Sequence, residues 1–167
     1  MSLDLGAGQE AAPTSGGFDE IQPAWSPDGR TLFFVRAREP GHRLEPGDLF
    51  GSYEGGDIWA LDIETKRETR IAENASNPAV SPDGARLAFD ASWAQPRRLW
   101  ITDIRGRNPR QASADTSEAV VHVRPRWSPD GRRLVFQNIE KTRFLVRVVD
   151  VETQRLTSVT NEVFLDL

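Results

Sequence analysis

The 167-residue chain contains no cysteine, and its only histidines are His42 and His122. It therefore forms no disulfide and has no cysteine-ligated metal site. No apolar run approaches the roughly 20 residues of a membrane-spanning helix, so we expect no membrane span. Residues 1–17 lack the basic start and the apolar segment of a secretory signal, and their Gly, Ala and Ser content predicts a flexible lead-in. The missing signal indicates either a cytoplasmic protein or a mature chain.

Motifs of the common catalytic classes are also missing. The sequence has no Gly-x-Ser-x-Gly nucleophile elbow, no phosphate-binding loop and no His-Glu-x-x-His zinc motif. We therefore expect no catalytic residue, no metal and no cofactor in this chain, and we favour a binding protein over an enzyme. The net charge of −4 argues against nucleic acid as the main partner.

What the sequence does contain is one five-residue stretch in three copies. It reads Trp-Ser-Pro-Asp-Gly at residues 25–29 and 127–131, and Val-Ser-Pro-Asp-Gly at residues 80–84. Proline presets φ for a tight turn, aspartate can bond its own backbone, and glycine takes the positive φ that closes the turn. A proline lies two residues before each copy, and an apolar run follows it. Each copy therefore predicts a β-hairpin.

Two further strand-like segments follow each hairpin. The first of them is apolar with an aspartate at its fifth position, over residues 58–63, 99–104 and 146–151. A four-stranded repeat of about 40–45 residues is typical of a β-propeller blade. We therefore predict an all-β chain with three four-stranded blades, at about residues 18–74, 75–117 and 118–160. A β-sandwich, the rival fold, gives no reason for one turn to recur at this interval.

These repeats resemble the TolB-like family of WD-like β-propellers. The family motif is approximately Pro-x-Trp-Ser-Pro-Asp-Gly-x-x-Ile-x-Phe, followed by an Ile-Trp/Tyr-x-x-Asp strand and a Leu-Thr ending. It matches all three repeats over roughly residues 18–160, and Val80 and Arg147 depart from it where tryptophan is expected. The resemblance implies TolB-like repeats over residues 18–167 and a non-catalytic periplasmic scaffold that binds a protein or peptide partner. The alternative is an accessory propeller of a prolyl-oligopeptidase-like serine peptidase or an amidohydrolase.

The resemblance implies six blades, and this chain has three. Propellers close with about four to eight blades, so the chain is either a fragment of a longer propeller or half of a six-bladed ring. Residues 18–73 contain 7 basic and 12 acidic residues, whereas residues 118–160 contain 8 and 5. A homodimer could pair the acidic first blade of each copy with the basic third blade of the other. Residues 163–165 could then pair across the junction.

Four residues are candidates for ligand binding, namely Asn77, Trp93, His122 and Arg124. His122 and Arg124 fall at the strand that should line the central channel, and Asn77 and Gln22 are their counterparts in the other repeats. Ordinary polar lining of a wet channel is the simpler explanation of these residues, and the sequence favours it over a bound ligand. Trp93 falls outside the repeat pattern in a predicted loop, where an exposed tryptophan could anchor a partner.

Two other features have competing interpretations. Asp28, Asp83 and Asp130 each supply a single carboxylate, so a role in the turn explains them better than a calcium site, which needs several oxygens. The insertion over residues 37–56 contains five glycines. A loop that interrupts a rigid repeat can hold the function, but long loops are also tolerated at little cost.

Overall fold

The computed structural model describes most of the chain. The described residues are 14, 16–41, 43–44, 56–94, 96–141 and 143–160, together with the backbone of 2–4, 9–11 and 163–164. His42 and residues 45–55, the middle of the predicted insertion, lie outside them. The part of the chain that the structure describes contains no helix able to cross a lipid bilayer.

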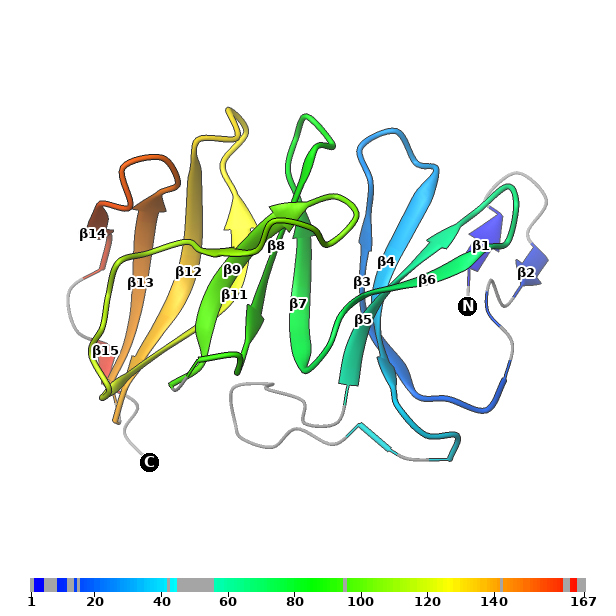
Figure 1. Ribbon diagram of the computed structural model, residues 1–167, viewed down its shortest axis with the longest axis horizontal. Coiled ribbons are helices and arrows are strands. Elements are labelled where there is room, and N and C mark those ends of the chain that lie inside the picture. Colours follow the sequence, from blue (N-terminus) through cyan, green and yellow to red (C-terminus); the bar gives the residue numbers. More distant parts are fainter. Residues whose placement is uncertain are drawn as a thin grey trace.

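Three antiparallel sheets stand side by side, one for each sequence repeat (Figure 1). Blade 1 is formed by β3 (Glu20–Trp25), β4 (Thr31–Ala37), β5 (Gly56–Asp62) and β6 (Glu68–Ala72). Blade 2 is formed by β7 (Ala75–Val80), β8 (Arg86–Ala91), β9 (Arg98–Asp103) and β10 (Arg110–Gln111). Blade 3 is formed by β11 (Val120–Trp127), β12 (Arg133–Glu140), β13 (Arg143–Asp150) and β14 (Leu156–Ser158). The predicted all-β architecture of three four-stranded blades is confirmed.

Two short pairings lie at the ends of the chain. β1 (Ser2–Asp4) pairs with β2 (Gln9–Ala11) inside the predicted lead-in. β15 (Val163–Phe164) pairs with β13 of blade 3, with Val163 opposite Phe144. This strand therefore extends a sheet of its own chain, whereas the sequence suggested a pairing across a junction between copies.

The repeated motif forms the same turn in every blade. In blade 1 the Ser26 hydroxyl donates to Asp28 Oδ1 at 2.6 Å, and the N–H of Arg30 donates to the same oxygen at 3.0 Å. Gly29 has φ +69°, a conformation that glycine adopts without steric cost. The serine hydroxyl is the main reason that the pKa of the aspartate is lowered in all three turns. Each aspartate therefore has the turn role expected from the sequence.

The hydrophobic core lies between the blades rather than within them, because successive strand residues point to opposite faces of a sheet. Between blades 1 and 2, Phe33 and Ile58 pack with Leu87 and Phe89, and all are at most 1% exposed. A second set joins blades 2 and 3, with the buried residues Ala88, Leu99, Ile101, Ala112, Leu134, Phe136, Val149 and Val151. Burying a side chain of this size contributes about 1.5–3 kcal/mol, so each blade depends on its neighbour.

The first strand of each blade lies toward a common edge, because β7 packs against both β3 and β11. The outer strands β6, β10 and β14 lie at the far end of each sheet. This is the radial arrangement of consecutive propeller blades.

Candidate functional site

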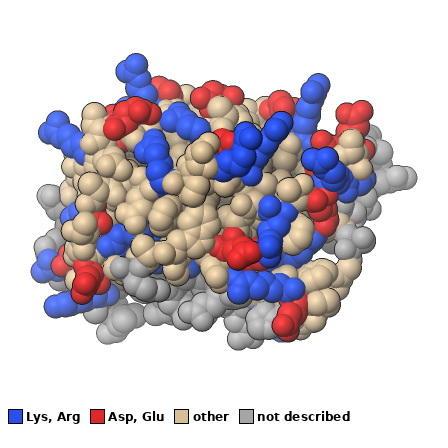
Figure 2. Space-filling model, in the orientation of Figure 1, with Lys and Arg blue, Asp and Glu red and all other residues tan. Residues whose placement is uncertain are grey.

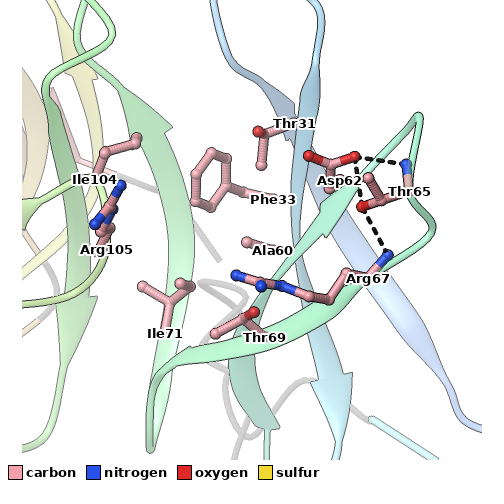
Figure 3. Close-up of a pocket in the computed structure, with 10 residues that line it drawn as sticks. All are labelled: Thr31, Phe33, Ala60, Asp62, Thr65, Arg67, Thr69, Ile71, Ile104 and Arg105. Atoms are coloured by element: carbon pink, nitrogen blue, oxygen red, sulfur yellow. Dashed lines mark hydrogen bonds between the residues drawn. The ribbon is translucent and has the colours of Figure 1, made fainter.

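A cleft of about 650 Å³ opens between blades 1 and 2 (Figure 3). Its apolar part is formed by Phe33, Ala60, Ile71 and Ile104. Polar and charged side chains complete the lining: Thr31, Asp62, Thr65, Arg67, Thr69 and Arg105. The cleft therefore combines an apolar floor with charged walls, as ligand-binding pockets commonly do.

One wall of the cleft depends on a close approach of two backbones. The turn after β9 reaches β6 at Gly106, where φ is +79°. A Cβ atom on Gly106 would lie 2.4 Å from the carbonyl oxygen of Ile71, so only glycine fits there. Asp103 Oδ1 accepts the N–H groups of Arg105 and Arg107 at 2.9 Å each and fixes the shape of this turn. Glycine at position 106 therefore places Ile104 and Arg105 in the cleft wall.

The charged side chains of the cleft differ in whether they have hydrogen-bond partners. Asp62 accepts hydrogen bonds from the N–H and the hydroxyl of Thr65, at 2.7 and 2.8 Å, and these bonds hold the pKa of its carboxyl below the ordinary value. Figure 3 shows the Arg67 side chain extending over Ala60, with Arg105 on the opposite wall. Neither guanidinium has a hydrogen-bond or ion-pair partner among the described residues. The cleft can therefore take a carboxylate attached to an apolar group.

The predicted channel residues belong to a second feature, a β-bulge repeated in all three inner strands. Gln22, Asn77 and Arg124 have φ of +54°, +57° and +56°, and the strand register shifts at each of them. A bulge inserts one unpaired residue and redirects its backbone groups. Each bulge residue is followed by the proline of the repeat, which offers no N–H to the ladder.

These bulges are linked from blade to blade by hydrogen bonds. The N–H of Asn77 donates to Gln22 Oε1 at 2.6 Å, and the Asn77 side chain donates to Asp90 Oδ2 at 2.8 Å. The same Asp90 oxygen accepts the N–H of Arg124 at 2.9 Å, while Arg97 Nε binds Asp90 Oδ1 at 2.5 Å. Burial raises the pKa of Asp90 and its neighbours oppose that effect. The polar groups of Asn77 are thus bound within the protein. Of the three bulge residues, only Arg124 has an exposed side chain.

His122, a residue of β11, is completely buried next to Asn138 of β12. Its Nε2 lies 3.1 Å from Asn138 Oδ1 and 3.4 Å from Asp115 Oδ2, and its Nδ1 lies 3.5 Å from Ser113 Oγ. Burial, with the positive charge of Arg98 second, lowers the pKa of His122 to about 4. The imidazole is therefore neutral at pH 7 and fastens the segment that precedes β11.

Trp93 lies at the surface, 38% exposed, but its ring is held on two sides. Its Nε1 donates to the carbonyl of Glu73 at 2.7 Å, and its ring centroid lies 5.2 Å from Phe89 and 5.1 Å from Trp100. The structure thus does not bring Asn77, His122, Arg124 and Trp93 into one pocket, and a ligand-binding role for them stays a prediction. The sequence analysis did not predict the cleft. The signal available for it was Gly106, a glycine at the repeat position that Thr65 occupies in the first blade.

Two comparisons agree with this geometry. Over 131 residues the chain is 31% identical to the Tol-Pal system protein TolB of Anaeromyxobacter dehalogenans, a match that covers 76% of this chain and 26% of that protein. It superposes on the crystal structure of TolB from Acinetobacter baumannii with a TM-score of 0.73 at 18% identity, over 95% of this chain and 36% of that one. The chain is a TolB-like β-propeller.

The TolB-like chain also resembles the structures of propeller proteins with other names. Oligogalacturonate lyase of Vibrio parahaemolyticus matches with a TM-score of 0.67 at 17% identity, over 95% of this chain and 46% of that one. Acylaminoacyl peptidase of Pyrococcus horikoshii matches with a TM-score of 0.58 at 17% identity, over 87% and 24%. No family model matches the sequence. The chain spans about a quarter of the length of its curated TolB relatives, and the similarity of the structures concerns the fold.

Among the described residues, no three His, Asp or Glu side chains form a group that could hold a metal ion.

Proposed function

We propose that this TolB-like propeller is a non-catalytic scaffold that binds a protein or peptide partner, and that the cleft between blades 1 and 2 holds part of that partner. The observation that carries the proposal is the pairing of an apolar floor with two guanidinium groups, Arg67 and Arg105, that have no hydrogen-bond or ion-pair partner in the described part of the chain. An arginine binds a carboxylate in a planar two-point contact. A peptide with an acidic residue or a free C-terminus next to an apolar side chain matches both parts of the cleft.

The test is a selection of random heptapeptides against the immobilised protein, followed by fluorescence polarisation with the selected sequences. We expect them to combine Asp or Glu with Leu, Ile or Phe. The double variant Arg67→Glu/Arg105→Glu should bind them at least tenfold more weakly. Arg67→Glu and Arg105→Glu are also measured singly, and Arg155→Glu is their control, because it makes the same charge change as each of them on an exposed arginine of blade 3. Equal binding by the double variant and the parent protein would refute the proposal.

A second candidate function is that of an accessory propeller attached to a hydrolase or lyase. It is favoured by the propeller neighbours among peptidases and oligogalacturonate lyases. The likeness to these enzymes concerns the fold, and fold alone does not carry function. The reading frame of the natural gene is the discriminator: a catalytic domain encoded downstream supports this candidate.

The proposal also covers the cellular location of the protein and its assembly into a dimer. A periplasmic location is supported by the likeness to TolB, and cell fractionation of the full natural reading frame tests it. We also propose that two copies complete a six-bladed ring. This assembly is supported by the acidic balance of blade 1 and the basic balance of blade 3.

A further inference from the structure

The joint between blades 2 and 3 is closed by three of its own side chains. The indole Nε1 of Trp127 in blade 3 donates to the carbonyl of Ala79 in blade 2 at 2.9 Å. The guanidinium carbon of Arg86, also from blade 2, lies 4.6 Å from the Trp127 ring centroid, within the range of a cation–π contact. Arg86 Nη2 donates to the carbonyl of Gly131 at 2.8 Å, and its Nη1 lies 3.8 Å from Glu152 Oε1. Arg86 therefore links the indole to a carboxylate across the joint.

The joint between blades 1 and 2 lacks all three side chains. Val80 stands at the position of the tryptophan, directly before the motif serine, and Thr31 stands at the position of the bridging arginine, five residues after the motif serine of its blade. Arg105 stands at the position of Glu152, because each is the second residue after the aspartate that ends the third strand. The ring and the bridging cation are therefore missing here, and the carboxylate is replaced by a cation.

The small side chain of Val80 borders a hollow of about 310 Å³ at the inner strands. Pro23 and Ala24 of β3 line it from blade 1, and Pro78 and Val80 of β7 line it from blade 2. The lining is completed by Ala79, Pro82, Arg126 and Trp127. Ala24 lies two residues before the motif serine, as does Ala79, whose carbonyl accepts the indole N–H in the next joint. We call the space between Pro23, Ala24, Pro78 and Val80 the inner hollow, and it has a carbonyl at the position where the next joint has the acceptor of its indole.

The inner hollow lies next to the cleft. Val80 packs against the same hydrophobic cluster as Phe33, which forms part of the cleft floor, and Thr31 lines the cleft. In the next joint the single side chain of Arg86 spans the equivalent distance from the ring to the carboxylate. Thr31 is too short to do so. A ligand can therefore take the place of that arginine and connect the ring position with Arg105.

Arg105 is the charged group that is available to a bound carboxylate. Figure 2 shows Lys and Arg side chains beside Asp and Glu side chains along the edge of the molecule where the turns of the blades lie. The carboxylates near Arg105 are bound by other residues, since Asp62 accepts from the hydroxyl of Thr65 at 2.8 Å and Asp103 accepts from Arg107 Nε at 2.8 Å. The Arg105 guanidinium has no partner in the part of the chain that the structure describes, so the carboxylate of a ligand complements its charge.

The spacing in the closed joint indicates which carboxylate of a peptide fits. The cation of Arg86 lies 4.6 Å from the ring centroid, so a ligand that replaces both groups needs its carboxylate at a similar distance from its own ring. The terminal carboxylate of a C-terminal tryptophan meets this condition, because only Cα and Cβ separate it from the indole. In an extended peptide the side chains of adjacent residues point to opposite faces. The geometry therefore favours a chain that ends in tryptophan over an acidic side chain beside an internal tryptophan.

We propose that the cleft binds the C-terminus of a partner chain that ends in tryptophan. The indole enters the inner hollow and donates its N–H to the Ala24 carbonyl, and the terminal carboxylate lies against Arg105. The complex repeats the joint between blades 2 and 3 with its charges exchanged, because the ligand anion stands where Arg86 stands and Arg105 stands where Glu152 stands. The inference rests on the proposed function and names the residue that the cleft selects.

The first test is a set of amide-detected NMR titrations of the protein with small probes. N-acetyl-L-tryptophan carries the ring and the carboxylate, N-acetyl-L-tryptophanamide lacks the carboxylate, and N-acetyl-L-leucine lacks the ring. We expect the first probe to bind about tenfold more tightly than the other two, with its largest shifts at the amides of Ala24, Val80 and Arg105. Largest shifts elsewhere, or equal binding by either of the other two probes, would overturn the proposal. N-acetyl-aspartyl-tryptophanamide keeps an acidic side chain but blocks the C-terminus, and if it binds as tightly as N-acetyl-L-tryptophan, the choice of the terminal carboxylate is wrong.

The second test closes the joint by mutation. The triple variant Thr31→Arg/Val80→Trp/Arg105→Glu restores the side chains of the closed joint, so it should unfold at a higher temperature and bind N-acetyl-L-tryptophan about tenfold more weakly. The matched control makes the same three exchanges at exposed residues of blade 3, namely Arg155→Glu, Thr157→Arg and Val159→Trp. It should bind the probe as the parent protein does. Undiminished binding by the triple variant would show that the site is wrong.

Arg105→Glu alone keeps the test decisive if the triple variant does not fold. It should weaken the binding of N-acetyl-L-tryptophan about tenfold and leave that of N-acetyl-L-tryptophanamide unchanged, and an equal loss for both probes would contradict the role of the charge. The peptide selection tests the proposed function separately. If selected peptides depend on Arg67 and Arg105 while N-acetyl-L-leucine and N-acetyl-L-tryptophan bind equally, the proposed function stands and the C-terminal tryptophan is refuted.

Discussion

The side-chain oxygen of Gln22 in blade 1 accepts the backbone N–H of Asn77 in blade 2 at 2.6 Å. Both residues have positive φ, so a bulge in one blade holds a bulge in the next. Asn77 continues the link through its side chain to the buried Asp90, which binds the third bulge at Arg124. The inner edge is therefore a connected polar network, and such networks stabilise when every member is satisfied.

We expect Asn77→Ala to lower the free energy of unfolding by about 2–5 kcal/mol. It removes a hydrogen bond to a buried carboxylate, worth about 1–3 kcal/mol, and adds the strain of an alanine at positive φ, about 1–2 kcal/mol. Asn108→Ala is the matched control, because Asn108 also has positive φ (+56°) but is exposed. Urea denaturation of the two variants gives the difference, and equal losses would show that the Asp90 bond contributes nothing.

Gly106→Ala should destabilise the protein by more than Gly29→Ala does. Both glycines have positive φ, but a Cβ at 29 meets nothing within 4 Å, whereas a Cβ at 106 meets the Ile71 carbonyl. Backbone strain alone costs about 1–2 kcal/mol, and forced repacking adds about 1–3 kcal/mol. Thermal unfolding measures both variants. Since the displaced turn carries Ile104 and Arg105, peptide binding in the cleft should weaken only for Gly106→Ala.

The stability of the fold should fall as the pH drops from about 6.5 toward 4, because of His122. Its pKa is about 4 when folded against about 6.5 when unfolded, so the unfolded state takes up the proton first. The slope approaches about 1.4 kcal/mol per pH unit in this window. Arg98, Arg147 and Asp115 are the charged groups that act on the ring.

His122→Gln removes this titration and keeps a polar side chain at the site. The difference in unfolding free energy between parent and variant should therefore change over pH 4.5–7 and become constant above pH 7. Carboxylates such as Asp28 titrate in both proteins, so they cancel in that difference. A difference that is independent of pH across the window would contradict the assignment.

The two equivalent tryptophans should respond differently to loss of the indole N–H. Trp127→Phe removes the hydrogen bond to Ala79 and weakens the contact with Arg86. It should cost about 1–3 kcal/mol in the free energy of unfolding. Trp25→Phe should leave the stability of the monomer unchanged within about 0.5 kcal/mol, because Trp25 is 54% exposed. Urea denaturation of the two variants checks both values.

The blades could be predicted because the information for them is local. The Ser-Pro-Asp-Gly turn and the alternating apolar runs determine the backbone conformation of the few residues that contain them. Both patterns occur in all three repeats. The bulges were not predicted, since a proline after Gln22 or Asn77 does not reveal the sign of φ before it. Burial of His122 depends on Asn138 and Asp115, which the sequence does not place beside it.

The cleft could not be predicted either, because it arises from what two neighbouring blades leave unfilled. Only a comparison of joints shows that Thr31 and Val80 stand where Arg86 and Trp127 close the next joint. The pairing of β15 with β13 shows the same limit. A two-residue strand has no pattern of its own, and the nearest free edge decides its partner.

The linked bulges also set the height at which each blade meets the next. Gln22, Asn77 and Arg124 occupy the same level of their strands, and the hydrogen bonds between them oppose sliding along the strand direction. Repeating units that advance along their axis at every step build a spiral, whereas units held level return to their starting point. A stack of blades joined in this way therefore stays level, because no blade can slide along its strands past the next.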